Sequence, residues 1–180
     1  MRSSSVVVEA GSPALTGVSV TSAGSYGFWI RNASPALTSC SARSGGTFGI
    51  YLDTTTGTTA TTITNCSLNA TGYGVYVSAA SGSSVTATIS NSVITNHGNY
   101  GVYRRTGFGA TAVTVTYSDV WGNGSGNYLN VTPGTGASLA TRTRTHGAPN
   151  SASTSCATAS VKRSSNDGGS ALAKALMRAT

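Results

Sequence analysis

The sequence predicts an all-β solenoid, in which the chain winds into stacked coils of strands and turns, and three observations support this. A motif of aromatic, glycine, aliphatic and aromatic residues occurs four times, as SYGFW, TFGIY, GYGVY and NYGVY. Around it, apolar and polar residues alternate with the period of two that is typical of strands. The units follow one another at a nearly constant spacing, and repeats of about 20 to 50 residues build solenoids because no single repeat buries its core alone.

Each unit opens with a short strand centred on an aliphatic residue. The segments TITNCSL, TISNSVI and TVTYSDV superpose without a gap, and the matching Asn65 and Asn91 mark a turn after this strand. No segment within the units has helical periodicity, so we expect strands and turns only. The five opening residues, at spacings of 22, 26, 26 and 26, are Leu15, Leu37, Ile63, Ile89 and Val115.

The aromatic motif predicts a longer strand in each unit, with one face toward the core. Residues such as Phe28 and Ile30 are expected to point inward, and the preceding glycine to let the backbone turn tightly. Equivalent residues of successive coils lie about 4.8 Å apart and so form ladders along the axis. We expect one ladder at the edge of the interior (Tyr26, Phe48, Tyr73 and Tyr100) and a second facing solvent (Trp29, Tyr51, Tyr76 and Tyr103).

Composition and charge narrow the class of protein. Only 8% of the 180 residues are charged, and Thr, Val, Tyr and Gly favour strands and tight turns over helices. The net charge is +7, but residues 1–136 carry +2 and residues 137–180 carry +5, spread out rather than clustered. Because a nucleic-acid site needs a concentrated basic surface, we expect no nucleic-acid partner.

The repeat divides the chain into three parts. We expect a lead-in at 1–14, parallel β-helix repeats at 15–136 and a basic low-complexity tail at 137–180, with a short helix at 170–179. The tail is interpreted as disordered or as the product of a reading-frame change. No apolar stretch reaches the length of a membrane span, and the three valines near the start are too few for a signal peptide.

The units resemble the right-handed parallel β-helix family, which has the pectin-lyase-like fold. The resemblance covers Leu15 to Gly136 and rests on the pattern I-[TS]-N-[CS]-x-[LVI] followed by the strand G-[VI]-Y; the unit at 117–136 is similar to the final coil of secreted bacterial members. It implies about five coils and an extracellular or cell-surface bacterial protein, of which this chain would be a piece. Solenoid ends that stay open would permit self-association. Because this fold carries lyases, hydrolases and adhesins alike, the resemblance does not imply one activity.

The solvent-facing ladder is the best candidate for a binding site. Four rings in line at sheet spacing offer stacking surfaces to the sugars of a polysaccharide, while the competing interpretation is that these rings only pack on one another. Arg104 and Arg105 follow Tyr103, and an arginine beside an aromatic strip can hold the carboxylate of an acidic sugar. We therefore predict a non-catalytic scaffold that binds polysaccharide through Trp29, Tyr51, Tyr76, Tyr103, Arg104 and Arg105.

The main alternative is a fragment of a polysaccharide lyase or glycoside hydrolase. In lyases of the resembled fold an arginine serves as base beside a calcium-binding Asp cluster, and this cluster is missing because Asp53 and Asp119 fall three coils apart. His97 has no partner at a sensible spacing and is interpreted as a solvated turn residue. We therefore expect no catalytic constellation, no metal site and no cofactor.

Two other ladders follow from the repeat. Cys40 and Cys66 are 26 residues apart and predict buried thiols continued by Ser92 and Ser118, not a disulfide. A second alternative function is ice binding by an outward array of threonines around the opening residues. Its members are Ala36, Thr38, Thr62, Thr64, Thr88, Ser90, Thr114 and Thr116.

Overall fold

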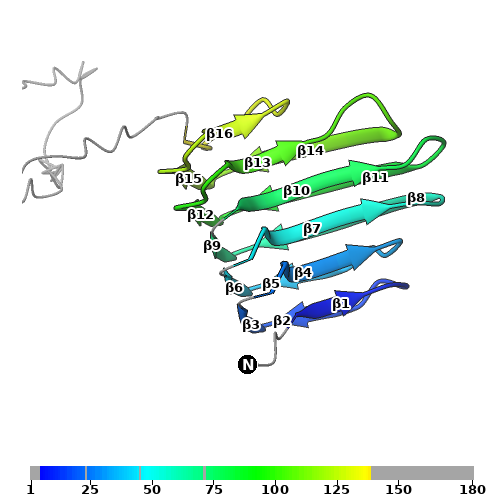
Figure 1. The fold of residues 1–180 in the computed structure, drawn as a ribbon, viewed down its shortest axis with the longest axis horizontal. Coiled ribbons are helices and arrows are strands. Elements are labelled where there is room, and N and C mark those ends of the chain that lie inside the picture. The colour runs from blue at the N-terminus through cyan, green and yellow to red at the C-terminus, as the bar shows by residue number, and fades with distance from the viewer. Residues whose placement is uncertain (1–4, 23, 45, 71, 139–180) are drawn as a thin grey trace, which may run out of the picture. The chain divides into compact units, whose positions relative to one another are not determined.

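The computed structural model describes residues 5–22, 24–44, 46–70 and 72–138, which form strands and connecting turns without a helix (Figure 1). The predicted tail and its helix at 170–179 lie outside these residues. Within them the prediction of a right-handed parallel β-helix of about five coils is confirmed. Because these residues form no helix, none of their segments is a helix that could span a membrane.

Five coils each contribute one strand to each of three parallel sheets, and the first sheet has a sixth strand, β16 (Gly126–Leu129). The first sheet contains β1 (Val6–Val8), β4 (Tyr26–Arg31), β7 (Phe48–Thr54), β10 (Tyr73–Ala79), β13 (Tyr100–Arg104) and β16 (Gly126–Leu129). The second contains β2 (Ala14–Thr16), β5 (Ala36–Thr38), β8 (Thr58–Thr64), β11 (Ser84–Ser90) and β14 (Ala110–Thr116). The third contains β3 (Ser19–Ser22), β6 (Ser41–Ser44), β9 (Ser67–Ala70), β12 (Val93–Thr95) and β15 (Asp119–Trp121). In Figure 1 the strands of the first sheet lie one above another from β1 to β16.

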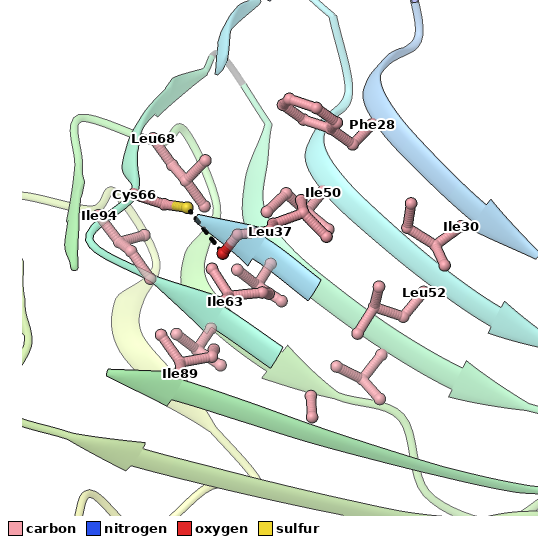
Figure 2. Close-up of a cluster of buried hydrophobic side chains, with 14 of the residues drawn as sticks. Phe28, Ile30, Leu37, Ile50, Leu52, Ile63, Cys66, Leu68, Ile89 and Ile94 are labelled. Carbon is pink, nitrogen blue, oxygen red and sulfur yellow. Dashed lines mark hydrogen bonds between the residues drawn. The ribbon is translucent and has the colours of Figure 1, made fainter. Parts of the chain in front are cut away.

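Inward-pointing aliphatic columns from the three sheets meet in one core (Figure 2). Register places Ile50 opposite Phe28 in the first sheet, and Ile63 opposite Leu37 in the second. These four side chains are at most 1% exposed. Since full burial of such a side chain stabilises a protein by about 1.5–3 kcal/mol, stacking the coils supplies the driving force that one coil lacks.

The motif glycines are required by close packing between coils. A Cβ atom at Gly74 would lie 2.4 Å from the carbonyl oxygen of Gly101 and 2.5 Å from Cγ2 of Ile94. Gly27 and Gly49 each meet the carbonyl oxygen of the next glycine in the same way, at 2.5 and 2.7 Å. The prediction that these glycines allow a tight turn was therefore wrong, since none of the three has a positive φ. Glycine is required because a larger side chain would collide with the next coil.

In each coil, the turn between the strands of the second and third sheets contains a residue in the left-handed conformation, and these residues form a column. Its members all have positive φ, between 48° and 68°, and the predicted turn at Asn65 and Asn91 is thereby confirmed. Glycine and asparagine tolerate this left-handed conformation, whereas an aromatic residue does so at a cost. The column runs through Gly17, Ser39, Asn65, Asn91 and Tyr117.

The two ends of the coil stack differ. At the C-terminal end the backbone N–H groups of Gly134 and Ser138 donate to the carbonyls of Val115 and Ser118, so residues 134–138 cover the edges of β14 and β15. The hydroxyl of Tyr128 donates to the Ser138 carbonyl across the same end. At the other end β1, β2 and β3 are the edge strands of the described sheets, and self-association there stays a prediction.

Candidate functional site

The aromatic residues of the motif form two columns on the outer face of the first sheet. Strand register places Tyr51 opposite Trp29, Tyr76 opposite Tyr51 and Tyr103 opposite Tyr76. The second column lies on this same outer face and contacts the first, instead of bordering the interior as expected. We call the eight half-buried rings the aromatic ridge: Tyr26, Phe48, Tyr73, Tyr100, Trp29, Tyr51, Tyr76 and Tyr103.

The motif glycine explains why both columns face outward. Along β4 the half-buried Tyr26 is followed by two buried residues, Gly27 and Phe28, before the half-buried Trp29. Strict alternation would have put Tyr26 and Trp29 on opposite faces. Because Gly27 and Phe28 both face inward, Trp29 lies on the same face as Tyr26. Only glycine fits the additional inward position, since a Cβ atom at Gly27 would lie 2.5 Å from the Gly49 carbonyl oxygen.

Most ring faces of the ridge are covered by other rings. Tyr26 stacks on Phe48 with centroids 5.5 Å and planes 10° apart, and Phe48 stacks on Tyr73 at 5.5 Å and 16°. The parallel stacking of ring planes ends at Tyr76. Its ring plane is inclined by 75° to that of Phe48 and by 82° to that of Tyr73. Because stacked rings expose their edges, the ridge presents C–H edges and phenol hydroxyls more than open faces.

A polar column borders the ridge two residues further along each strand. Asp53 lies opposite Arg31 on one side and Ser78 on the other, and the Arg105 backbone N–H donates to the carbonyl of Val77, the residue before Ser78, in the preceding coil. We call these residues the polar column: Arg31, Asp53, Ser78 and Arg105. Its charges therefore run positive, negative, neutral and positive along four successive coils.

The polar column and the ridge interact electrostatically. Burial raises the pKa of Asp53 above its usual value, while Arg31 and Arg105 act to lower it. Burial likewise raises the pKa of Tyr51, and the Asp53 charge adds to this, whereas a hydrogen bond with Ser78 opposes it. Tyr51 thus interacts electrostatically with Asp53 and through a hydrogen bond with Ser78, which links the middle of the ridge to the polar column.

The two predicted arginines have different surroundings. Arg104 lies in register with the inward Val77, and its guanidinium donates to the carbonyls of Asn130 and, at 3.1 Å, Thr111. Arg104 therefore connects backbone segments of the last coils and does not border the ridge. Arg105 does border the ridge, and its guanidinium carbon lies 3.8 Å from the ring centroid of Phe108.

Phe108 was not identified from the sequence. Its side chain is 59% exposed on the loop between β13 and β14. Gly109 beside it is required there, because a Cβ atom would lie 2.1 Å from the Ala80 carbonyl oxygen. The signal that was available is the segment GFG, an aromatic residue between two glycines at a coil corner.

Two donors at one end of the ridge, one in it and one in the polar column, have no acceptor among the residues that the structure describes. They are Nε1 of Trp29 and Nε of Arg31, both buried. The Arg31 guanidinium carbon lies 5.8 Å from the Trp29 ring centroid, so the two side chains pack together. Leaving buried N–H groups unpaired costs free energy, so a ligand acceptor that reached Trp29 and Arg31 would remove this cost.

The remaining ionisable residues do not form a catalytic cluster in the described part of the chain. Asp53 lies on the first sheet and Asp119 on the third, and no group of three His, Cys, Asp or Glu residues is placed to hold a metal ion there. His97 is 1% exposed, so its interpretation as a solvated residue was wrong. Its backbone N–H donates to Oδ1 of Asn123, which fixes this turn inside the stack.

The predicted ladder of thiols and hydroxyls is present. Cys40 and Cys66 are free and buried, and their thiols donate to the carbonyls of Leu15 and Leu37 in the preceding coil (Figure 2, for Cys66). Ser92 continues the column, since its hydroxyl accepts from the Cys66 backbone N–H at 3.1 Å.

The outer face of the second sheet carries the predicted threonines. Thr62, Thr88 and Thr114 lie directly opposite one another and are exposed. In the neighbouring column the hydroxyls of Thr64 and Ser90 are hydrogen-bonded at 3.2 Å.

Fold and surface together define a parallel β-helix repeat protein with an aromatic face. A family model described as the right handed beta helix region matches residues 2–114, well over half of the chain. This chain belongs to that family. No curated protein and no solved structure matches it.

Proposed function

We propose that this protein is a β-helix scaffold that binds polysaccharide along the aromatic ridge. The observation that carries the proposal is the alignment of eight rings in two columns over four successive coils on one outer face, bordered by the polar column. Four coils extend the ridge over roughly 14 Å, which is enough for several sugar units. Such a role is exercised outside the cell or at its surface, where polysaccharides of cell envelopes are accessible.

The stacked geometry determines how a glycan would be held. Sugar C–H groups would pack on the face of the rotated ring of Tyr76, and sugar hydroxyl oxygens would meet the positive ring edges and pair with the phenol hydroxyls beside them. Because each ring is already fixed by its neighbours, little side-chain entropy would be lost on binding. This pre-organisation favours the ridge as a binding surface over a cluster of isolated exposed aromatics.

The test is binding of the purified chain to a panel of neutral and acidic polysaccharides, followed by affinity electrophoresis and calorimetry. A Tyr51→Phe/Tyr76→Phe/Tyr103→Phe variant removes three hydroxyls and keeps the ring stacking, as Phe48 already does in its own column. Tyr117→Phe is the matched control, because Tyr117 is 62% exposed outside the ridge. The proposal is supported if the parent and the control bind the same polysaccharide and the triple variant binds it at least about ten-fold more weakly.

The same assay decides against the enzymatic alternative or in favour of it. Release of reducing ends or unsaturated sugars by the parent chain would assign this protein to the polysaccharide lyases or glycoside hydrolases of the pectin-lyase-like fold. Unchanged polymer length after prolonged incubation supports a scaffold. If no polysaccharide is retained by a folded parent, the ridge is sheet packing and the proposal fails.

A second candidate function, ice binding, is favoured by one observation on the second sheet. The register aligns Thr62, Thr88 and Thr114 into a flat exposed column of hydroxyl and methyl groups. Thermal hysteresis measures this function directly. A Thr88→Tyr substitution should abolish any hysteresis, whereas Thr21→Tyr, on the exposed side of β3, should not.

A further inference from the structure

The polar column lies where it would meet any chain bound on the ridge. Each of its members follows a ridge residue by two positions, so alternation places the two side chains on the same face of the sheet, with Arg105 directly after the end of β13. Arg31 follows Trp29, Asp53 follows Tyr51, and Arg105 follows Tyr103. A polymer aligned with the coil axis would therefore pass one polar group per coil.

The charges of this column do not suit a polyanion. An anionic polysaccharide carries its charge at regular intervals and needs a run of cations to hold it. Here the central charge is the carboxylate of Asp53, opposite Arg31 in register and influenced by both Arg31 and Arg105. Arg104, the third arginine on this sheet, donates to backbone carbonyls at the end of the stack.

The chemistry of the column suits uncharged hydroxyl groups instead. A sugar hydroxyl both donates and accepts hydrogen bonds. Asp53 offers an acceptor, Arg31 and Arg105 offer donors, and the hydroxyl of Tyr51 offers both, while Ser78 is 4% exposed and pairs with Tyr51. Phe108 packs on the Arg105 guanidinium, which holds this donor at the border of the ridge.

We infer that the ligand of the aromatic ridge is a neutral polysaccharide, with Asp53 excluding anionic chains. This inference rests on the proposed function, since it names the ligand class of the same site. Asp53 is a specificity-determining residue: its carboxylate accepts from a neutral sugar and repels an acidic one.

The experiment compares neutral and anionic derivatives of one backbone. Hydroxyethylcellulose is paired with carboxymethylcellulose, and dextran with carboxymethyl-dextran, at physiological salt. Asp53→Asn removes the charge and keeps the shape, while Asp119→Asn removes the same charge from the third sheet and leaves the net charge of the two variants equal. The parent should bind the neutral member of a pair at least about ten-fold more tightly than the anionic member.

The variants should then separate the role of Asp53 from net charge. Asp53→Asn should reduce the preference to within about three-fold, chiefly by strengthening binding of the anionic member, and Asp119→Asn should leave the preference unchanged. An equal effect of the two substitutions, or tighter binding of the anionic member by the parent, would overturn the inference.

The failure of this inference differs from the failure of the proposed function. Anionic binding that is lost in the Tyr51→Phe/Tyr76→Phe/Tyr103→Phe variant would keep the ridge as the site and overturn the neutral ligand. If the triple variant still binds the anionic polysaccharide, that binding is assigned to residues 137–180, which carry a net charge of +5. If, in addition, the parent binds no neutral polysaccharide, both proposals are overturned. Absence of binding to either member of both pairs also overturns both.

Discussion

The rings of Tyr76 and Tyr103, on neighbouring coils, lie with centroids 4.6 Å apart and planes inclined by 31°. Tyr76 also contacts Phe48, Tyr51 and Tyr73, at 5.1, 5.4 and 5.2 Å. Both columns of the ridge and three of its four coils therefore meet at this ring. The ridge is consequently part of what holds the coils together as well as a candidate binding surface.

Substituting Tyr76→Ala should destabilise the solenoid. Each aromatic pair contributes about 0.5–1.5 kcal/mol beyond area burial, and a half-buried ring contributes part of the 3–5 kcal/mol of a buried one, so we expect a loss of about 2–3 kcal/mol. Urea denaturation followed by circular dichroism measures the free energy of unfolding. Tyr117→Ala is the control and should lose much less, since its ring contacts the segment at Gly136 and no ridge ring; equal losses for the two would show that the ridge rings do not couple the coils.

Alkaline pH should destabilise the protein through the same residue. Burial raises the pKa of Tyr76 from 10.0 to about 12, and the charges of Tyr103, Tyr51 and Tyr73 add to this, while Arg105 opposes it. The folded state therefore favours the neutral phenol. The resulting stabilisation is fully present below about pH 10 and is lost as the pH rises from there through 12.

The measurement is the free energy of unfolding of the parent and of Tyr76→Phe between pH 8 and about pH 11.5. The variant should lose less stability over this window, because phenylalanine has no proton to release. Identical pH dependence in the two proteins would mean that Tyr76 is not held neutral by the fold.

The solenoid itself was predictable because its signal is repeated. One strand of three residues carries little information, but the same pattern at Leu37, Ile63 and Ile89 identifies a register, and that register recurs as direct pairing. The position of Tyr26 was not predictable in the same way. Period-two alternation assigns it to the face opposite Trp29, and the two successive inward positions at Gly27 and Phe28 reverse this.

The candidate site was therefore only partly accessible from the sequence. The outward column through Tyr51 and Tyr76 follows from the repeat. The inward position of Arg104 follows the alternation of its strand but was not predicted, because an arginine is not expected in a column of valine and leucine. His97 was misjudged because its burial depends on contacts between coils, among them the hydrogen bond from its backbone N–H to Asn123 in the next coil.

The close approach of the coils makes Gly74→Ala a severe change. The added methyl group would lie 2.4 Å from the Gly101 carbonyl oxygen and 2.5 Å from Ile94 Cγ2, so the backbone would have to move apart. We expect a loss of about 3 kcal/mol or failure to fold. Gly57→Ala serves as comparison, since its Cβ would meet nothing within 4 Å and only the positive φ of 76° is penalised.

That comparison separates steric from conformational cost. Gly57→Ala should lose about 1 kcal/mol in the same denaturation experiment. A Gly74→Ala protein no less stable than Gly57→Ala would contradict the close packing of the motif glycines.

Replacing Tyr117 should, in contrast, stabilise the protein. Tyr117 has a φ of 48° in a column whose other members are glycine, serine and asparagine, and an aromatic residue in this conformation costs about 1 kcal/mol. Its ring covers Gly136, whose Cβ would lie 2.6 Å from Tyr117 Cδ1, so some contact is lost on substitution. We expect Tyr117→Asn to raise the free energy of unfolding by about 0.5–1 kcal/mol.

The reciprocal substitution checks the cause. Asn91 has the same conformation one coil earlier, with a φ of 49°, and is exposed. Asn91→Tyr should therefore lower the free energy of unfolding by about 1 kcal/mol, the same conformational penalty with opposite sign. If Tyr117→Asn were destabilising while Asn91→Tyr lost the expected amount, the contact of the Tyr117 ring with Gly136 would outweigh the backbone strain, and this ring would count among the groups that close the C-terminal end of the stack.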